Sequence, residues 1–150
     1  MMKYKFPMDV GAIMEYLPHR APMLMLDRVI GVYDGEIEAE KLVLENAFYF
    51  QGHFPNKPIM PGVMIVEAIA QVGALLASLE EGFDSDTNLL AFASIEKVKF
   101  RQLVYPNETL RVFAKIVKKR RNLYKFEGRA LMGDSLVTQI SFAATLVPRK

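Results

Sequence analysis

Residues 51–79 read QGHFPNKPIMPGVMIVEAIAQVGALLASL, and this stretch decides the fold. It opens as a proline-rich loop that holds one histidine, His53. From Pro61 onward nearly every residue is apolar, and Glu67 carries the only charge before Glu80. Proline suits the first turn of a helix, so we predict an apolar helix from about Pro61 to about Glu80. A helix that is apolar on most sides must be covered by other elements.

Six segments of the sequence have the pattern of strands and can supply this cover. Two of them precede the helix and are joined by Asp34-Gly35, a strong hairpin signal. Four follow the helix, and three pairs of turn-forming residues separate them: Pro106-Asn107, Arg121-Asn122 and Gly133-Asp134. We expect the strands at 23–33, 36–44, 89–100, 110–118, 123–131 and 136–147, with a short helix from Asp9 to about Tyr16 and a turn or helical piece at 46–50.

Strands linked by short turns pair antiparallel, and such a sheet can curl around a helix. The predicted fold class is therefore α+β, with one long central helix wrapped by a curved antiparallel sheet of about six strands. No second long helix is available to cover an edge of this sheet, so we expect pairing with another copy of the chain.

Length and composition limit the remaining possibilities. The 150 residues fit a single domain, 1–150, and a net charge of +2 does not suit a dedicated nucleic-acid binder. Disulfides and thiolate chemistry are excluded because the chain has no cysteine. The N-terminus lacks the pattern of a secretory signal, and Pro61, Glu67 and Gln71 interrupt the apolar stretch. We therefore expect a soluble cytoplasmic protein with no membrane segment.

Two titratable side chains in this stretch suggest acid/base chemistry. Burial of Glu67 among apolar neighbours would raise its pKa and supply a protonated acid near neutral pH. His53 lies 14 residues earlier and could act as a base. The first N–H groups of the helix, near Gly62, suit a developing oxyanion. A base, an acid and an oxyanion site are what elimination of water β to a carbonyl requires.

Each of these residues also has a structural interpretation. A loop histidine is more often structural than catalytic, Glu67 could close a structural ion pair, and Gly62 could serve the geometry of the loop. Two histidines without ligand-spaced partners make a poor metal site, so we expect neither a metal nor a cofactor. The residues alone indicate an α+β domain that is a candidate acid/base enzyme.

The run GHFPNKPIMPGV at 52–63, followed by Glu67-Ala68 and Ala70-Gln71, resembles the signature of FabZ-type 3-hydroxyacyl-[acyl-carrier-protein] dehydratases. The LPHR motif at 17–20 and the segment AFASIEKVKFRQLV at 91–104 are similar to other parts of that family. The resemblance implies a hot-dog fold and a hydro-lyase of fatty acid elongation. Such an enzyme converts (3R)-hydroxyacyl carrier protein into trans-2-enoyl carrier protein and water.

The resemblance also implies roles for individual residues. His53 would be the base, Glu67 the acid or hydroxyl-orienting group, and the Gly62 amide would bind the thioester carbonyl. His53 of one chain would face Glu67 of another at a dimer interface, and the dimers would associate in threes as a homohexamer. Glutamate at position 67 favours the non-isomerising enzymes over the FabA type, which carries aspartate there. Further substrate contacts are predicted at Phe54, Val63 and Gln71.

Two other functions share the expected fold. A hot-dog thioesterase would not need His53 in its Gly-His-Phe-Pro setting, and a non-catalytic acyl-binding subunit would not need both His53 and Glu67. The expected partner is an acidic acyl carrier protein, and we predict that it docks on the basic positions Lys97, Lys99 and Arg101.

His19 and Arg20, in the LPHR motif, are predicted to be structural and to pair with a carboxylate or a carbonyl group.

Overall fold

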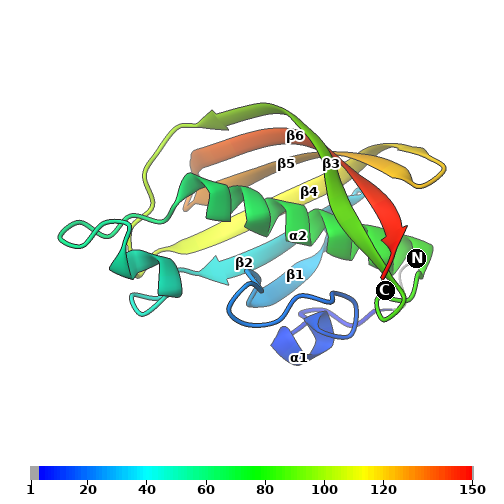
Figure 1. The fold of residues 1–150 in the computed structure, drawn as a ribbon, viewed down its shortest axis with the longest axis horizontal. Helices are drawn as coiled ribbons and strands as arrows, with labels where there is room; N and C mark the ends of the chain where they lie inside the picture. Colours follow the sequence, from blue (N-terminus) through cyan, green and yellow to red (C-terminus); the bar gives the residue numbers. More distant parts are fainter. Residues whose placement is uncertain (1–3, 150) are drawn as a thin grey trace.

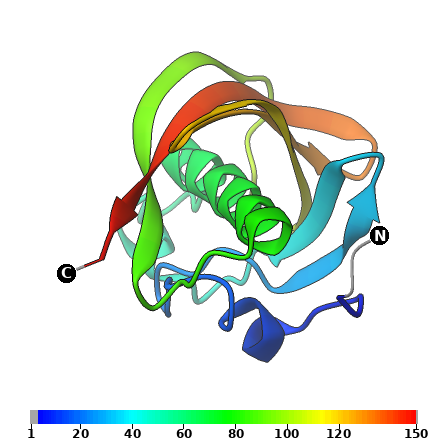
Figure 2. The same ribbon diagram turned by 90° about the vertical axis from the view of Figure 1, so that its right-hand side faces the viewer.

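One long helix, α2 (Gly62–Glu81), lies in the concave face of a single curved sheet. The structure, a computed structural model, describes residues 4–149. Viewed from its end, the helix is surrounded by the sheet on most sides, with the N-terminal segment across the open side (Figure 2). The predicted α+β class, with a helix wrapped in an antiparallel sheet, is confirmed.

The sheet has six antiparallel strands in the order β1-β2-β4-β5-β6-β3. Their bounds are β1 (Arg28–Tyr33), β2 (Glu36–Leu42), β3 (Asn88–Phe100), β4 (Thr109–Arg120), β5 (Leu123–Met132) and β6 (Ser135–Pro148). The strand that follows the helix, β3, crosses to the far edge and pairs only with β6 (Figure 1). Both β1 and β3 are therefore edge strands within the chain.

Strand alternation places the apolar side chains against the helix. On β2, Ile37 and Ala39 are buried, while Glu36, Glu38 and Glu40 are only partly covered. This is the half-buried alternation predicted from the sequence. The hairpin between β1 and β2 turns at Asp34 and Gly35, which have φ values of 52° and 78°. Both values lie in the left-handed region that this type of hairpin turn requires.

Both ends of α2 follow from local sequence. Pro61 is the extended residue just before the first helical residue, and Gly82 ends the helix with a φ of 68° while its N–H donates to the Ser78 carbonyl at 2.9 Å. Only glycine adopts this left-handed closing conformation at no steric cost. By length and composition α2 could cross a membrane, but 67% of its apolar 18-residue stretch is buried inside this fold.

Glycine lets α2 lie close to the sheet at one point. A Cβ added at Gly128 on β5 would lie against Ile69 of the helix and 2.8 Å from the carbonyl oxygen of Phe113 on β4. The helix could not pack this closely over a larger residue.

Two predicted boundaries near the N-terminus were wrong. Helix α1 (Val10–Ile13) starts at the predicted cap, where the Asp9 carboxylate accepts from the Ala12 N–H at 2.9 Å, but it ends three residues before Tyr16. The first strand begins at Arg28 instead of residue 23. Residues 23–25 do not pair in the sheet because a side chain of α2, Gln71, takes their backbone groups instead. The short 3-10 helix η1 (Phe48–Gln51) confirms the helical piece expected at 46–50.

Candidate active site

His53 lies in the loop between η1 and α2, held by a pair of hydrogen bonds to Ile59. Its Nδ1 is 2.7 Å from the Ile59 carbonyl oxygen, and the Ile59 N–H donates to the His53 carbonyl at 2.9 Å. A carbonyl oxygen can only accept, so in the neutral ring Nδ1 carries the hydrogen and Nε2 keeps its lone pair. The His53 ring is thus oriented as a base whose reactive nitrogen is not used within its own loop.

Phe54 follows His53 through a cis peptide bond and stacks on its ring, with centroids 4.1 Å apart. The Phe54 side chain is 50% exposed. The Phe54 ring thus covers one face of the His53 imidazole, while half of the Phe54 side chain remains exposed to solvent.

Glu67 is the sixth residue of α2, and its side chain is 22% exposed. One carboxylate oxygen, Oε2, accepts a hydrogen bond from Gln71 Nε2 at 2.5 Å. The same oxygen lies 3.7 Å from His19 Nε2. The carboxylate is therefore neither fully buried nor unpaired, unlike the isolated group that its apolar neighbours suggested.

Gln71 is 1% exposed and uses its whole amide within the chain. Its Oε1 accepts from the Met25 N–H at 2.8 Å, and its Nε2 donates both to the Met23 carbonyl at 2.8 Å and to Glu67. Both amide hydrogens are taken, so Gln71 has none left to donate to a substrate. Its geometry favours a role in holding Glu67 and in tying residues 23–25 to the helix.

His19 and Arg20 end the segment that leads from α1 towards this site. The Arg20 guanidinium donates to the carbonyl oxygens of Leu17, His19 and Met14 at 2.8, 2.8 and 3.1 Å, which confirms its predicted carbonyl pairing. Burial lowers the pKa of His19; the Glu67 charge opposes this effect and Arg20 adds to it. The predicted pairing of His19 with a carboxylate is met by Glu67. Which carboxylate this would be was not predictable, because 48 residues separate the two.

A small cavity of about 50 Å³ opens at Glu67, between α2 and the strands β3, β5 and β6. Its polar end is formed by His19, Glu67 and Gln71. Apolar side chains form the rest of its wall: Ala70, Ala74, Leu90, Phe92, Phe126, Phe142 and Ala144. The polar end and the apolar walls suit the junction between a polar group and a hydrocarbon chain, and at about 50 Å³ the cavity within one chain has room for only a few atoms of such a ligand.

Gly62 and Val63 lie at the start of α2. The first N–H groups of a helix have no acceptor inside it, so they are available to an oxyanion. A Cβ added at Gly62 would lie 2.8 Å from the Phe100 ring, so the ring packs directly over this glycine. Val63 is 68% exposed. Val63 therefore offers contact surface at the helix start, whereas the side-chain face of Gly62 is covered by Phe100.

The residues predicted for the site thus fall into two groups in the single chain. His53, Phe54, Gly62 and Val63 lie around the start of α2, whereas Glu67 and Gln71 line the cavity further along the helix. Within residues 4–149, the imidazole within 4 Å of Glu67 is that of His19 and not that of His53. The same residues contain no cluster of three or more His, Cys, Asp or Glu side chains that could hold a metal ion.

Comparison with known proteins identifies the family to which the chain belongs. The model of the FabA-like domain matches residues 17–141. A protein of Rhizorhabdus wittichii named 3-hydroxyacyl-[acyl-carrier-protein] dehydratase FabZ is 46% identical over 141 residues, covering 93% of this chain and 90% of its own. A protein of Koribacter versatilis with the same name is 45% identical over 150 residues, covering 99% and 96%.

Solved structures confirm the fold. The dehydratase heterocomplex ApeI:P from Xenorhabdus doucetiae matches with a TM-score of 0.76 at 19% identity, covering 96% of this chain and 93% of its own. A mutant thioesterase from Pseudomonas aeruginosa matches with a TM-score of 0.62 at 14% identity, covering 81% of each chain. With its hot-dog fold and a sequence that matches these relatives almost from end to end, the chain belongs to the family of FabZ-type 3-hydroxyacyl-[acyl-carrier-protein] dehydratases.

Proposed function

We propose that this protein is a hydro-lyase of fatty acid biosynthesis that removes water from a (3R)-hydroxyacyl thioester on acyl carrier protein. The product is the trans-2-enoyl thioester. The observation that carries the proposal is the glutamate at the polar end of an otherwise apolar cavity. A carboxyl group in that position can reach a hydroxyl near the head of an acyl chain while the chain contacts the apolar wall. We also propose that the enzyme acts in the cytoplasm.

The proposed reaction assigns one task to each of three groups. His53 Nε2 removes a proton from C2 of the substrate, and the Gly62 N–H stabilises the charge that develops on the thioester oxygen. The C2–H electron pair forms the C2–C3 double bond as the C3–O bond breaks. Glu67 gives a proton to the leaving hydroxyl, which departs as water. The proton held by His53 returns to Glu67 before the next turnover.

The proposal needs a second copy of the chain, because the single chain leaves His53 and Glu67 in separate groups. Two features support a dimer in which His53 of one protomer faces Glu67 of its partner. Strand β3 is an unpaired edge that exposes Phe92 and Ile95, at 43% and 46%. Apolar side chains are also exposed around the start of α2: Phe54, Val63, Phe100 and Leu103. We further propose that three such dimers form a hexamer.

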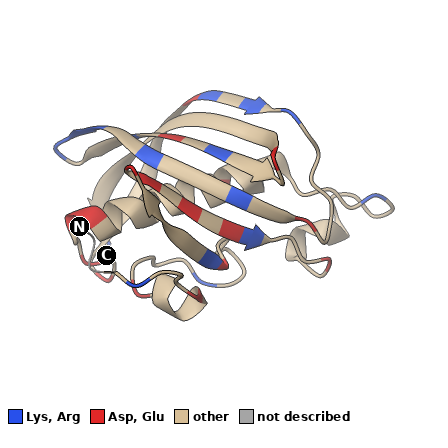
Figure 3. Ribbon diagram, turned by 180° about the vertical axis from the view of Figure 1, so that it is seen from behind, with Lys and Arg blue, Asp and Glu red and all other residues tan. Residues whose placement is uncertain are grey.

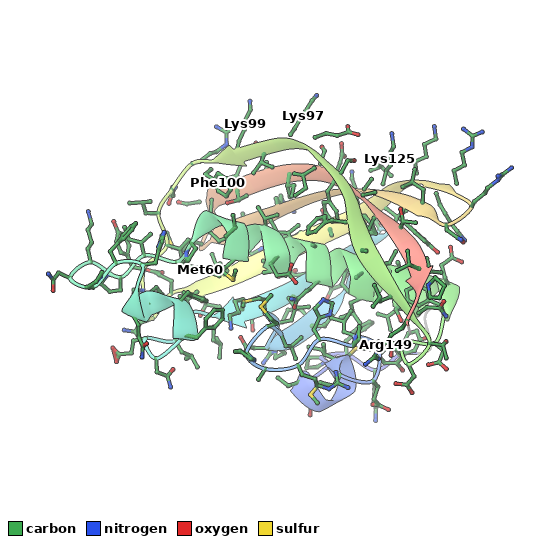
Figure 4. The ribbon with its side chains drawn as sticks, viewed as in Figure 1. Met60, Lys97, Lys99, Phe100, Lys125 and Arg149 are labelled. Carbon is green, nitrogen blue, oxygen red and sulfur yellow. The ribbon has the colours of Figure 1, made fainter. Side chains whose placement is uncertain are left out.

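The proposed carrier-docking surface lies on the outer face of the sheet. Lys97, Lys99, Lys115 and Arg129 line a hollow of about 390 Å³ there. Figure 3 shows basic positions on several strands of this face, beside the acidic residues of β2. In Figure 4, Lys97 and Lys99 point away from α2. Among the described residues, no carboxylate lies within 4 Å of Lys97, Lys99 or Lys115. These charges remain available to an acidic partner.

The activity is tested with a 3-hydroxyacyl carrier protein and mass spectrometry of the acyl chain. Wild type is expected to remove one water, and His53→Gln and Glu67→Gln are expected to lose this conversion by a factor of at least about 10³. Release of free acid with bare carrier would identify a thioesterase instead. Loss of water at wild-type rate in both variants would refute the proposed pair.

Docking is tested by reversing charges at Lys99 and Arg101. Lys99→Glu combined with Arg101→Glu is expected to raise the KM for carrier-bound substrate roughly tenfold and to leave the KM for a pantetheine thioester unchanged. The control is Lys118→Glu with Arg120→Glu, two charges on the β4–β5 hairpin. Equal changes with both substrates would exclude docking on this surface.

A further inference from the structure

We infer that His19 is a positioning residue that, together with Gln71, holds one oxygen of Glu67 and so presents the other oxygen to the substrate hydroxyl. This inference deepens the proposed dehydration and rests on it. Neither the family comparison nor the sequence assigns His19 to the chemistry; the assignment comes from the geometry around Glu67.

Both neighbours of the carboxylate face the same oxygen atom. Gln71 Nε2 donates to Oε2 at 2.5 Å, and His19 Nε2 lies 3.7 Å from Oε2. Within residues 4–149, no hydrogen bond reaches Oε1. The hydrogen bond from Gln71 to Oε2 favours a lone pair there, so a proton on Glu67 is favoured on Oε1. The side chain of Glu67 is thereby fixed with its proton-bearing oxygen turned away from its own chain.

The tautomer of His19 follows from its burial. Its Nδ1 is buried and has no hydrogen-bond partner among the described residues. A hydrogen on Nδ1 would leave a buried donor unsatisfied, at a cost of about 1–3 kcal/mol. The neutral ring therefore carries its hydrogen on Nε2, the nitrogen that faces Glu67. Burial lowers the pKa of His19 and so favours the neutral ring, which turns its Nε2–H towards Oε2 across 3.7 Å, a distance longer than a hydrogen bond, without adding charge.

Two anchors keep these donors in place, and both belong to the same stretch of chain. Arg20 binds three carbonyl groups of residues 14–19, which fixes the backbone at His19. Met23 and Met25 bind the Gln71 amide. The charged groups that act on His19 are Glu67 of α2 and the adjacent Arg20. The strands across the cavity contribute only apolar walls: Leu90, Phe92, Phe126, Phe142 and Ala144.

Steady-state kinetics with carrier-bound substrate provide the first test. His19→Leu removes the donor and is expected to lower kcat about 10- to 100-fold with little change in KM, because a misplaced catalytic group slows the chemical step. His19→Gln keeps an N–H near the position of Nε2 and is expected to retain most of kcat. A rise in KM with unchanged kcat in His19→Leu, or an equal loss of kcat in both variants, would show that His19 only lines the cavity and does not position Glu67. Thermal unfolding of each variant checks that it is folded.

The second test does not depend on activity. The chain has two histidines, so 15N-histidine NMR of the His53→Gln protein reports on His19 alone. Glu67→Gln in this background is expected to shift the pKa of His19, because the substitution alters the group that lies 3.7 Å from its Nε2. An unchanged titration would overturn the inference. If wild type removes no water but this coupling is present, the proposed function fails while the contact between His19 and Glu67 stands.

Discussion

At the scale of single residues, the Tyr49 hydroxyl is a buried polar group that lowers the free energy of unfolding. Tyr49 is 8% exposed, and its hydroxyl has no hydrogen-bond partner among the described residues. Burial, aided by the charge of Asp27, raises the pKa of Tyr49 to about 12. Folding therefore opposes ionisation of this phenol. The free energy of unfolding therefore falls as the pH rises from about 10 to about 12, where the phenol ionises in the unfolded chain and not in the folded one.

Removing this hydroxyl is expected to stabilise the protein. Tyr49→Phe should raise the free energy of unfolding by about 1 kcal/mol at pH 7, because it removes an unsatisfied buried group, and should reduce the loss of stability above pH 10. Urea unfolding at pH 7 and pH 10.5 measures both effects. Tyr105→Phe, at a 40% exposed tyrosine, is the matched control and should change neither. Destabilisation by Tyr49→Phe at pH 7 would mean that the hydroxyl has a partner in the assembled protein.

The residues assigned to the proposed site come mostly from one short motif. His53, Gly62 and Glu67 lie within 15 residues of one another, so their sequence context alone marks them. The positioning of Glu67 was not predictable, because His19 and the backbone of residues 23–25 reach it from a distant, irregular segment. Segments without periodicity carry no signal of which residue they will contact.

At the scale of elements, α2 lies close to the sheet at Gly128. A side chain there meets the Phe113 carbonyl oxygen, a backbone atom that cannot rotate away, as well as Ile69. The helix and the two strands β4 and β5 are thus held at a distance that only glycine permits.

Gly128→Ala is expected to lower the free energy of unfolding by about 1–3 kcal/mol, the usual range for overpacking a core. Chemical denaturation measures the change. Gly52→Ala is the matched control, since a Cβ at Gly52 has nothing within 4 Å and its φ of −108° suits any residue. A Gly128→Ala protein as stable as wild type would show that the helix can shift on the sheet.

Elements with strong local signals were predicted nearly to the residue. The helix α2 and the four strands after it begin and end within two residues of their expected bounds, because Gly82, Asn107 and Gly133 provide the left-handed turns between them. The strand expected from residue 23 failed for a physical reason. The apolar residues 23–25 do not pair in the sheet, because the backbones of Met23 and Met25 form hydrogen bonds with the side chain of Gln71 on α2.

At the scale of the whole molecule, the sequence favoured hairpins between neighbours but did not specify the position of β3. Its pairing with β6 brings residues 88–100 beside residues 138–148 and leaves β3 at an edge. Strand order depends on contacts between distant segments, which local patterns do not encode. That exposed edge is the surface on which the proposed dimer depends.

Mixed dimers test whether the site is shared between protomers. Co-expression of His53→Gln and Glu67→Gln chains is expected to restore about a quarter of wild-type activity, because half of the dimers are mixed and one of their two sites is intact. Each variant expressed alone is the control and should be inactive. If the two residues of one chain act together, every site has a defect and co-expression restores nothing.

The hydrogen bonds of Gln71 determine which substitutions the protein can tolerate near Glu67. Gln71 binds the backbone of residues 23 and 25 and not their side chains. The exposed position 23 is therefore free to change over time, and position 25, which is 1% exposed, needs only to remain apolar. Position 71 has no such freedom, because no other side chain of that length supplies two N–H donors together with an acceptor. A mutational scan should therefore find that position 71 tolerates few substitutions, that position 23 tolerates many, and that position 25 accepts apolar residues.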